Sequence, residues 1–391
     1  MKKRPRVVLL VETSNSYCRE LLRGIYAYIQ ENGPWSTYLT EQARGDPAPK
    51  WVLDNLQGDG IIARIENRRI AEAVMKTGLP VVDVSAARIV PEIPWVETDD
   101  AAMARLAAEH LLDRGFRHFG FVGNDRFHWS KWREEEFVRV VKQAENTCSV
   151  FRPQPSGRRL PMNLMEEEKQ LVTWIQKLPK PTGVMACYDV RGQQLLDVCH
   201  RIGVAVPDEM AVVSVDNDEM LCSLSDPPLS SVIPNTHQTG YEAARMLDRL
   251  MSGKSSGKHS LKIAPLGIAT RQSSDVLAVA DHHISQAMHF IREHACEGIK
   301  VDDVLKAVPL SRRVLEHRFK RLLGYSPHDE ILRMQFQRVV ELLSETALPL
   351  ATIAEHAGFR HAEYLSVAFK KRYNVTPSEY RRQNQRGNVR K

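Results

Sequence analysis

The chain has 391 residues, of which 43% are hydrophobic, and carries a formal net charge of +6. This length allows two or three domains, and the composition is that of a soluble chain with a sizeable core. The six cysteines show neither a C-x-x-C pair nor metal-ligand spacing, which excludes a disulfide scaffold and predicts reduced thiols in a cytoplasmic protein. No apolar run approaches the ~20 residues of a membrane span, and the start resembles a first strand rather than a signal peptide.

Short apolar runs alternate with amphipathic segments over residues 6–263. The predicted strands lie at residues 6–11, 38–40, 60–63, 79–84, 95–98, 118–122, 148–151, 184–187, 210–215 and 261–263. The predicted helices lie at residues 17–31, 68–76, 99–114, 131–145, 166–177, 191–202 and 238–251. This alternation is typical of an α/β domain with a parallel sheet that helices cover on both faces.

Polar side chains follow several predicted strands, at the ends where parallel sheets bind ligands. They are Ser14, Asn15, Asp83 to Arg88, Asp125 to Arg133, Asp189, Arg191 and Asp216 to Asp218. Carboxylates accept hydrogen bonds from hydroxyl groups, and Arg and Asn side chains donate them, which suits a polyhydroxylated ligand. Trp129 could stack on a sugar ring, although core packing is the alternative. No phosphate loop, Gly-x-Ser-x-Gly or His-Glu-x-x-His motif occurs in the sequence, so we expect binding rather than catalysis, and no metal or cofactor.

Three stretches of this region, residues 97–123, 181–218 and 228–247, resemble the effector domain of LacI-type repressors, which has the fold of periplasmic sugar-binding proteins. The resemblance implies two lobes hinged by crossing strands, with a sugar in the cleft between them. By position, the ligand contacts expected from the motifs and strand ends together are Asn15, Trp129, Arg133, Asp189, Arg191, Asp216 and Asn217. Surface charges or buried salt bridges are the alternative for the charged members of this set.

All of the excess positive charge lies at the C-terminal end of the chain. Residues 282–391 hold 19 Lys and Arg against 12 Asp and Glu, whereas the remainder holds 35 against 36. A basic segment is often only a solvated surface. Together with a suitable motif, it indicates binding to a phosphate backbone.

That motif is a helical hairpin that occurs twice. Residues 314–331 and 364–381 align without a gap at an offset of 50 residues, with Phe319 on Phe369 and Pro327 on Pro377. Each follows a shorter amphipathic segment and a breaker, the pattern of a helix-turn-helix. The segment Pro327 to Glu345 between them predicts a rigid connecting helix. Two structural hairpins in a helical cap are the alternative.

Residues 283–381 resemble the DNA-binding domain of the AraC/XylS family, which has two helix-turn-helix units joined by a long helix. The resemblance rests on Phe369, Lys370, Thr376, Pro377, Tyr380 and Arg381, with Asn374 at a position where the family usually has glycine. It implies units at about residues 300–324 and 350–374. The DNA contacts that it predicts are Arg312, Arg313, Glu316, His317, Lys320, His361, Glu363, Tyr364, Val367, Lys370 and Lys371.

These residues divide into two expected roles. Arg313, Glu316 and His317 are expected to read bases from the first recognition helix, and Glu363, Tyr364 and Val367 from the second. Arg312, His361, Lys370 and Lys371 are better suited to phosphate. The second helix offers few strong base readers, so we expect it to contribute more to affinity than to sequence choice.

The two resemblances predict an α/β two-lobed effector domain at residues 1–275, a linker at 276–283 that includes His282 and His283, and an all-α DNA-binding domain at 284–391. The combination, and the stretch 287–305 in particular, is similar to bacterial regulators of xylose operons. It implies a homodimeric transcription regulator, expected to be an activator that contacts RNA polymerase and promoter DNA, with D-xylose or another pentose as effector. The alternative is a cytoplasmic sugar-binding protein or an enzyme with an incidental helical tail.

Overall fold

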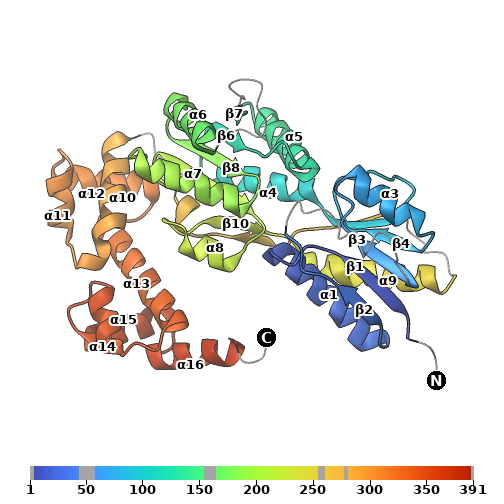
Figure 1. The fold of residues 1–391 in the computed structure, drawn as a ribbon. Coiled ribbons are helices and arrows are strands. Elements are labelled where there is room, and N and C mark those ends of the chain that lie inside the picture. The colour runs from blue at the N-terminus through green and yellow to red at the C-terminus, as the bar shows by residue number, and fades with distance from the viewer. Residues whose placement is uncertain (1–3, 44–57, 154–163, 254–259, 277–280, 389–391) are drawn as a thin grey trace. The chain divides into compact units, whose positions relative to one another are not determined.

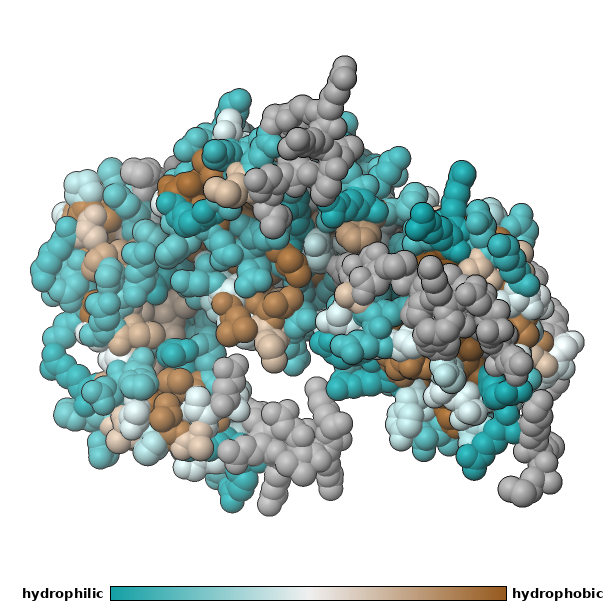
Figure 2. All heavy atoms as spheres, in the orientation of Figure 1, coloured by the Kyte–Doolittle hydropathy of each residue, from teal (hydrophilic) through white to brown (hydrophobic). Residues whose placement is uncertain are grey.

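The computed structural model describes residues 4–43, 58–153, 164–253, 260–276 and 281–388. The chain divides into two compact units, Met1–Val276 and Leu277–Lys391, the first mixed α/β and the second helical (Figure 1). On the face drawn in Figure 2, both units are mostly hydrophilic, with hydrophobic side chains gathered in small patches. Within the described ranges, no helix combines the length and hydropathy needed to cross a membrane.

Among its described residues, the first unit contains two six-stranded sheets. The first sheet has the order β11-β5-β4-β3-β1-β2, with all of its paired strands parallel. Its strands are β1 (Arg6–Leu10), β2 (Ser36–Leu39), β3 (Gly60–Ala63), β4 (Val81–Asp83), β5 (Trp95–Thr98) and β11 (Ser260–Ile263). The second sheet has the order β12-β10-β9-β8-β6-β7, and only β12 runs antiparallel to its neighbour. Its strands are β6 (His118–Val122), β7 (Thr147–Phe151), β8 (Thr182–Ala186), β9 (Met210–Val215), β10 (Ser230–Ile233) and β12 (Gly267–Ala269).

Each sheet and its helices form a lobe. The first lobe has α1 (Ser16–Asn32), α3 (Arg68–Lys76) and α9 (Thr236–Met251). The second has α4 (Asp100–Asp113), α5 (His128–Gln143), α6 (Leu164–Lys177), α7 (Asp189–Arg201), α8 (Glu219–Leu224) and the 3-10 turn η1 (Gln272–Ser274). The chain passes between the lobes three times: from β5 to α4, from β10 to α9, and from β11 to β12. This is the two-lobed architecture that the sequence predicts.

Two strands and one α-helix of this unit were not predicted, nor was the 3-10 turn η1. Helix α8 has only six residues, and β12 has three, so neither is long enough to show a clear period. Strand β10 begins with two serines, whose side chains are buried and hydrogen-bonded within the lobe. Burial of polar side chains removes the apolar signal on which a strand prediction depends. Helix α5 also begins at His128, three residues before its predicted start.

Helices α1 and α9 pack so closely that glycine is required on both. A Cβ on Gly24 would lie 1.9 Å from the carbonyl oxygen of His237, and one on Gly240 would lie 1.9 Å from that of Leu21. Both contacts are with backbone, which no side-chain rotation relieves. Since α9 also contacts β3, β4 and β5, this contact fixes the return of the chain into the first lobe.

The substitution Gly240→Ala is therefore expected to lower the free energy of unfolding by about 3 kcal/mol or more, because the helices must separate to admit the methyl group. Urea unfolding followed by circular dichroism measures the change. Arg249→Ala, at an exposed position of the same helix, is the control and should change stability by less than about 0.5 kcal/mol. Equal stability of Gly240→Ala and the parent chain would contradict the close helix contact.

The second unit has seven α-helices among its described residues. They are α10 (His282–His294), α11 (Val301–Ala307), α12 (Arg312–Leu323), α13 (Pro327–Glu345), α14 (Leu350–His356), α15 (Ala362–Tyr373) and α16 (Pro377–Asn388), with the 3-10 turn η2 (Ala295–Glu297) after α10. One core includes Leu315 and Phe319 of α12, and a second includes Leu365 and Phe369 of α15. Helix α13 contributes to both cores, which confirms the predicted connecting helix.

The repeat has a local physical basis at the starts of α13 and α16. The Ser326 hydroxyl accepts a hydrogen bond from the Asp329 N–H, and the Asp329 carboxylate accepts one from the Ser326 N–H. Thr376 and Glu379 form the same reciprocal pair fifty positions later. A proline occupies the first helical position after each cap, where its missing N–H costs no hydrogen bond. The Ser-Pro and Thr-Pro pairs therefore start equivalent helices in the two halves.

Helix α10 begins two residues earlier than the sequence predicts. The Asp281 carboxylate accepts hydrogen bonds from the backbone N–H groups of His283 and Ile284, which caps the helix at residue 281. The two histidines therefore lie in the first helical turn and not in the linker. Of the remaining predicted linker, residues 277–280 lie outside the described residues.

Candidate ligand cavity and nucleic-acid interface

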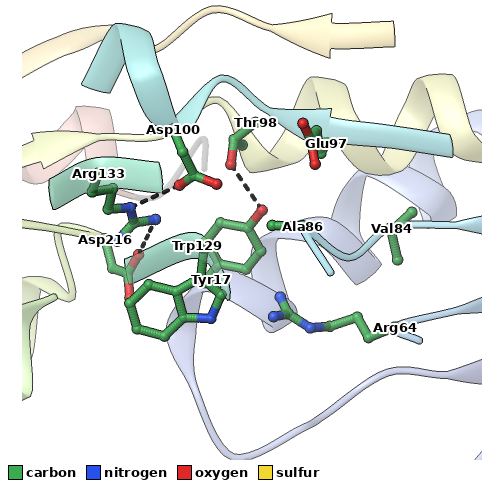
Figure 3. A pocket seen from close by; sticks show the side chains of 10 residues that line it. All are labelled: Tyr17, Arg64, Val84, Ala86, Glu97, Thr98, Asp100, Trp129, Arg133 and Asp216. Carbon is green, nitrogen blue, oxygen red and sulfur yellow. Dashed lines mark hydrogen bonds and ion pairs between the residues drawn. The ribbon is translucent and has the colours of Figure 1, made fainter. Parts of the chain in front are cut away.

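A small polar cavity lies between the lobes of the first unit, where strands of both sheets end (Figure 3). Its volume is about 20 Å³, which is space for about one water molecule. Strands and loops of the first lobe, helix starts and the end of β9 all contribute to its wall. The lining residues are Tyr17, Arg64, Val84, Ala86, Glu97, Thr98, Asp100, Trp129, Arg133 and Asp216.

Arg133 is the centre of the charged network in this cavity. Its Nε donates a 2.7 Å hydrogen bond to Asp100 Oδ1, and its Nη2 lies 3.9 Å from Asp216 Oδ1. Its Nη1 donates to the carbonyl oxygen of Cys187, and its guanidinium lies 4.8 Å from the centre of the Trp129 ring. Burial raises the pKa of Asp100, and the positive charge of Arg133 opposes that rise. The buried cation is thus paired on one side and faces an aromatic ring on the other.

The first lobe supplies polar residues that sequence reasoning missed. The Tyr17 hydroxyl lies 3.0 Å from the Thr98 hydroxyl, and the Arg64 guanidinium lies 5.4 Å from the centre of the Tyr17 ring. Within the part of the chain that the structure describes, Arg64 Nε and Glu97 Oε2 are buried without a hydrogen-bond partner, although Arg64 Nε lies 4.0 Å from Glu12 Oε1. Burial raises the pKa of Glu97 to about 7, although the hydrogen bond from Arg88 lowers it. Since Arg64 directly follows a predicted strand, its position was a signal that could have identified it.

Of the seven predicted ligand contacts, Trp129, Arg133 and Asp216 line the cavity. The other four do not line it. Asn15 caps α1 by accepting from the Cys18 N–H, and it donates to Glu12. Arg191 donates to the Gly123 carbonyl oxygen and lines a separate groove formed with α6.

Asp189 and Asn217 support the wall of the cavity without lining it. The Asp189 carboxylate accepts hydrogen bonds from the hydroxyls of Ser214 and Ser231, and from the Asp218 N–H at 2.7 Å. It thereby holds the turn in which Asp216 and Asn217 both have positive φ, 110° and 48°. Such backbone is costly for residues other than glycine and persists only where its surroundings enforce it. Asp189 therefore positions Asp216, which does line the cavity.

The loop after β4 reaches the cavity through Val84 and Ala86, and Asp83 organises it. Asp83 Oδ1 accepts from the N–H groups of Ser85 and Ile65, and its Oδ2 lies 3.1 Å from the Ser85 hydroxyl. That hydroxyl also lies 3.2 Å from the Ile65 carbonyl oxygen and has a single hydrogen to donate. A protonated Asp83 can donate to Ser85 while Ser85 donates to Ile65. Burial raises the pKa of Asp83 to about 7, against the lowering effect of these hydrogen bonds.

This raised pKa predicts a pH dependence of stability. The folded state favours protonated Asp83, so its contribution is full below about pH 4 and is lost as the pH rises through about 7. The substitution Asp83→Asn does not titrate, so the free energy of unfolding of the parent chain should fall relative to this variant between about pH 5 and about pH 7.5. Urea unfolding at both pH values measures this difference in the free energy of unfolding. Asp197→Asn, at an exposed position, is the control. A difference between parent and Asp83→Asn that stays constant with pH would contradict the assignment.

In the second unit, α12 and α15 each bury one apolar face and expose the other. The eleven predicted DNA contacts are all exposed. Arg312 forms ion pairs with Asp302 at 3.1 Å and with Glu316, another member of this set, at 3.0 Å. A groove of about 590 Å³ is lined by the first turns of both helices, including Arg312 and Tyr364, and by Arg360 just before α15. The exposed starts of the two helices are thus presented together.

Family models cover most of the chain. Residues 6–101 match a XylR N-terminal domain, residues 108–274 a periplasmic binding protein-like domain, and residues 304–383 a helix-turn-helix domain. Within the described ranges, no cluster of His, Cys, Asp or Glu side chains is arranged to hold a metal ion. The fold and its two sites define a ligand-responsive transcription regulator with a DNA-binding helical unit.

Comparison with known proteins gives the family. The chain is 33% identical to the xylose operon regulatory protein of Escherichia coli over 97% of both chains, and 32% identical to that of Haemophilus influenzae over 96% of this chain and 98% of the relative. A solved structure of a xylose-binding transcription activator is 32% identical, with a TM-score of 0.81 over 98% of this chain and 99% of that one. The chain belongs to the family of xylose operon regulatory proteins. A cellobiose complex of the regulator CelR shares the effector fold, with a TM-score of 0.54 at 19% identity over 70% of this chain and 86% of that one.

Proposed function

We propose that the chain is a transcription activator whose effector is D-xylose or another pentose, bound between the lobes of the first unit. The observation that carries the proposal is the cavity itself, where Arg133, Asp100, Asp216, Arg64 and Glu97 converge beside an aromatic ring. The names of the relatives, and of the solved xylose-binding activator, support the choice of sugar.

The cavity offers the chemistry that a sugar needs. Carboxylates accept from hydroxyl groups, guanidinium groups donate to them, and Trp129 presents a surface for the apolar face of the ring. Arg64 Nε and Glu97 Oε2, which lack a hydrogen-bond partner among the described residues, would gain hydrogen bonds from ligand hydroxyls. A sugar is several times larger than the cavity of about 20 Å³, so entry requires the lobes to separate about their three connections.

The sugar then acts as a switch through its differential affinity for two arrangements of the lobes. Residues of the first lobe and of the second lobe both line the cavity, so a bound sugar favours the arrangement in which it contacts both. In our proposal the chain acts as a cytoplasmic homodimer, which converts this change into a new placement of its DNA-binding units and a contact with RNA polymerase.

Each DNA-binding unit is proposed to place α12 and α15 in successive major grooves of promoter DNA, about one helical turn apart. Arg313 on α12 can form two hydrogen bonds to a guanine edge. The exposed side of α15 bears Tyr364 and Val367 near its start and Lys370 and Lys371 near its end. These features support base reading by the first helix and a larger share of phosphate binding by the second.

The sugar site is tested by Asp216→Asn, which keeps the size of the side chain but removes the charge near Arg133. The variant should bind D-xylose about tenfold more weakly or worse, because a hydrogen bond to a charged group is lost. Thermal unfolding of the full chain with increasing D-xylose measures it, with a panel of other pentoses and hexoses in parallel. Asp197→Asn, an exposed position in the same lobe, should respond as the parent chain does. An undiminished response of Asp216→Asn would refute the site, and a stronger response to a hexose would refute the choice of sugar.

Base reading is tested by Arg313→Ala. This variant should lose about 1–3 kcal/mol at the DNA that the chain prefers and little on random DNA of equal length. Lys370→Ala is the matched comparison. It should weaken binding to both DNAs and lower the number of ions released on binding, taken from the salt dependence, by about one. Fluorescence anisotropy titrations at several salt concentrations measure both effects. An equal loss for Arg313→Ala on the two DNAs would mean that Arg313 contacts phosphate, and no binding to the DNA upstream of the chain's own gene would favour the alternative of a sugar-binding protein.

A further inference from the structure

The two helix-turn-helix cores of the second unit meet at one buried amide, that of Gln335. On α13, Ile331 and Met334 belong to the first core, whereas Phe336 and Val339 belong to the second. Gln335 lies between these two sets and is only 5% exposed. A side-chain amide with so little access to water is expected to find its hydrogen bonds within the protein.

Gln335 binds one backbone carbonyl on each side of the junction. Its Nε2 donates to the carbonyl oxygen of Ala295 at 2.9 Å and to that of Gly358 at 3.2 Å. Ala295 begins η2 and belongs to the first core. Gly358 lies in the turn between α14 and α15, the helices of the second helix-turn-helix. Since the amide nitrogen carries two hydrogens, it can satisfy both carbonyl groups together.

The backbone segments held by Gln335 also contact each other directly. Gly298 and Gly358 have left-handed backbone, with φ of 77° and 78°. A Cβ on Gly358 would lie 2.8 Å from the Ala295 carbonyl oxygen and 2.8 Å from the Gly298 nitrogen, and one on Gly298 would lie 3.2 Å from the Gly358 oxygen. No side chain separates the two segments at this point. A contact of backbone on backbone has no rotamers through which it can lengthen or shorten.

We propose that this contact, which we call the Gln335 clamp and which consists of Gln335, Ala295, Gly298 and Gly358, sets the spacing of the two DNA half-sites that the chain accepts. The inference rests on the proposed reading of DNA by both α12 and α15. One base pair inserted between the half-sites moves one of them by about 3.4 Å and turns it by about 35°. A rigid junction between α12 and α15 cannot adjust to this displacement of one half-site. The chain therefore selects DNA with one spacing.

Gln335 acts here as a positioning residue through the backbone that it holds. The substitution Gln335→Met retains the approximate length of the side chain and removes both donors. The two carbonyl groups then no longer share a hydrogen-bond donor, and the methionine side chain fills the space at the junction with apolar atoms. The expected variant recognises the same two half-sites but tolerates a change in the distance between them.

The test is selection of binding sites by the full-length chain from a random pool of duplex DNA, followed by sequencing. For each DNA-binding unit, the parent chain should select the half-sites of α12 and α15 at one spacing, and a one-base-pair insertion between them should weaken binding by about tenfold or more. Gln335→Met should select the same half-sites at two or more spacings and lose most of the insertion penalty. Val339→Ala removes core packing on the same helix without touching the clamp, so it should unfold at a lower temperature and still select one spacing.

Gly358→Ala provides an independent route to the same result, because its methyl group pushes the two segments apart. It should broaden or shift the selected spacing even if Gln335→Met proves too unstable to purify. A single, unchanged spacing in every folded clamp variant overturns the clamp. Selection of one isolated half-site by the parent chain instead overturns the paired reading of DNA, and the clamp with it, so the two failures are distinguishable.

Discussion

The effector unit depends on a buried positive charge at the junction of its lobes. The Arg133 guanidinium is removed from water and is held by Asp100, with Asp216 close by. An unpaired charge in such a position would be prohibitive, so some acceptor has to face it in every arrangement of the lobes. Asp100 is the first residue of α4, directly after one of the three connections between lobes. The charge network therefore includes the residue that directly follows one of the hinge connections.

In the proposed mechanism, this arrangement lets a neutral sugar act on a charged site. Ligand hydroxyls can donate to the carboxylates and accept from the guanidinium, so they can enter the network without leaving a charge unpaired. The positive-φ turn at Asp216 and Asn217, supported by Asp189, holds one acceptor at a fixed position in the second lobe. Arg64 Nε and Glu97 Oε2 of the first lobe lack hydrogen-bond partners among the described residues. In our proposal, a ligand that contacts both sets of residues stabilises the arrangement in which it touches both lobes, through its differential affinity.

Much of the fold follows from local sequence signals, whereas the site follows from long-range contacts. Strands β3, β5, β6 and β9 have the predicted bounds, and β3, β6 and β9 are mainly apolar runs between polar residues or turns. Trp129, Arg133 and Asp216 were predicted to bind ligand and do line the cavity. Tyr17 and Asp100 could not be identified in this way, since each resembles an ordinary residue in a first helical turn, and only the crossing connections bring them together.

The predicted residues outside the cavity are equally informative. Asn15 and Asp189 are polar residues at strand ends, as expected, but their oxygen atoms accept from nearby backbone N–H groups or from hydroxyls buried in neighbouring strands. A sequence shows that a hydrogen-bond acceptor is present. It does not show whether the donor is a ligand or another group of the protein. The same holds for Gln335, whose polar side chain would be expected on an exposed face of α13 and is instead buried between two cores.

Reciprocal linkage between sugar and DNA tests the central claim most directly. The affinity of the full-length chain for the DNA upstream of its own gene is measured with and without saturating D-xylose, and its affinity for D-xylose is measured with and without that DNA. If the lobes couple the two sites, D-xylose strengthens DNA binding, and DNA strengthens D-xylose binding by the same factor, of about 5-fold to 150-fold. Tight binding of D-xylose with no change in the affinity for DNA would contradict the account.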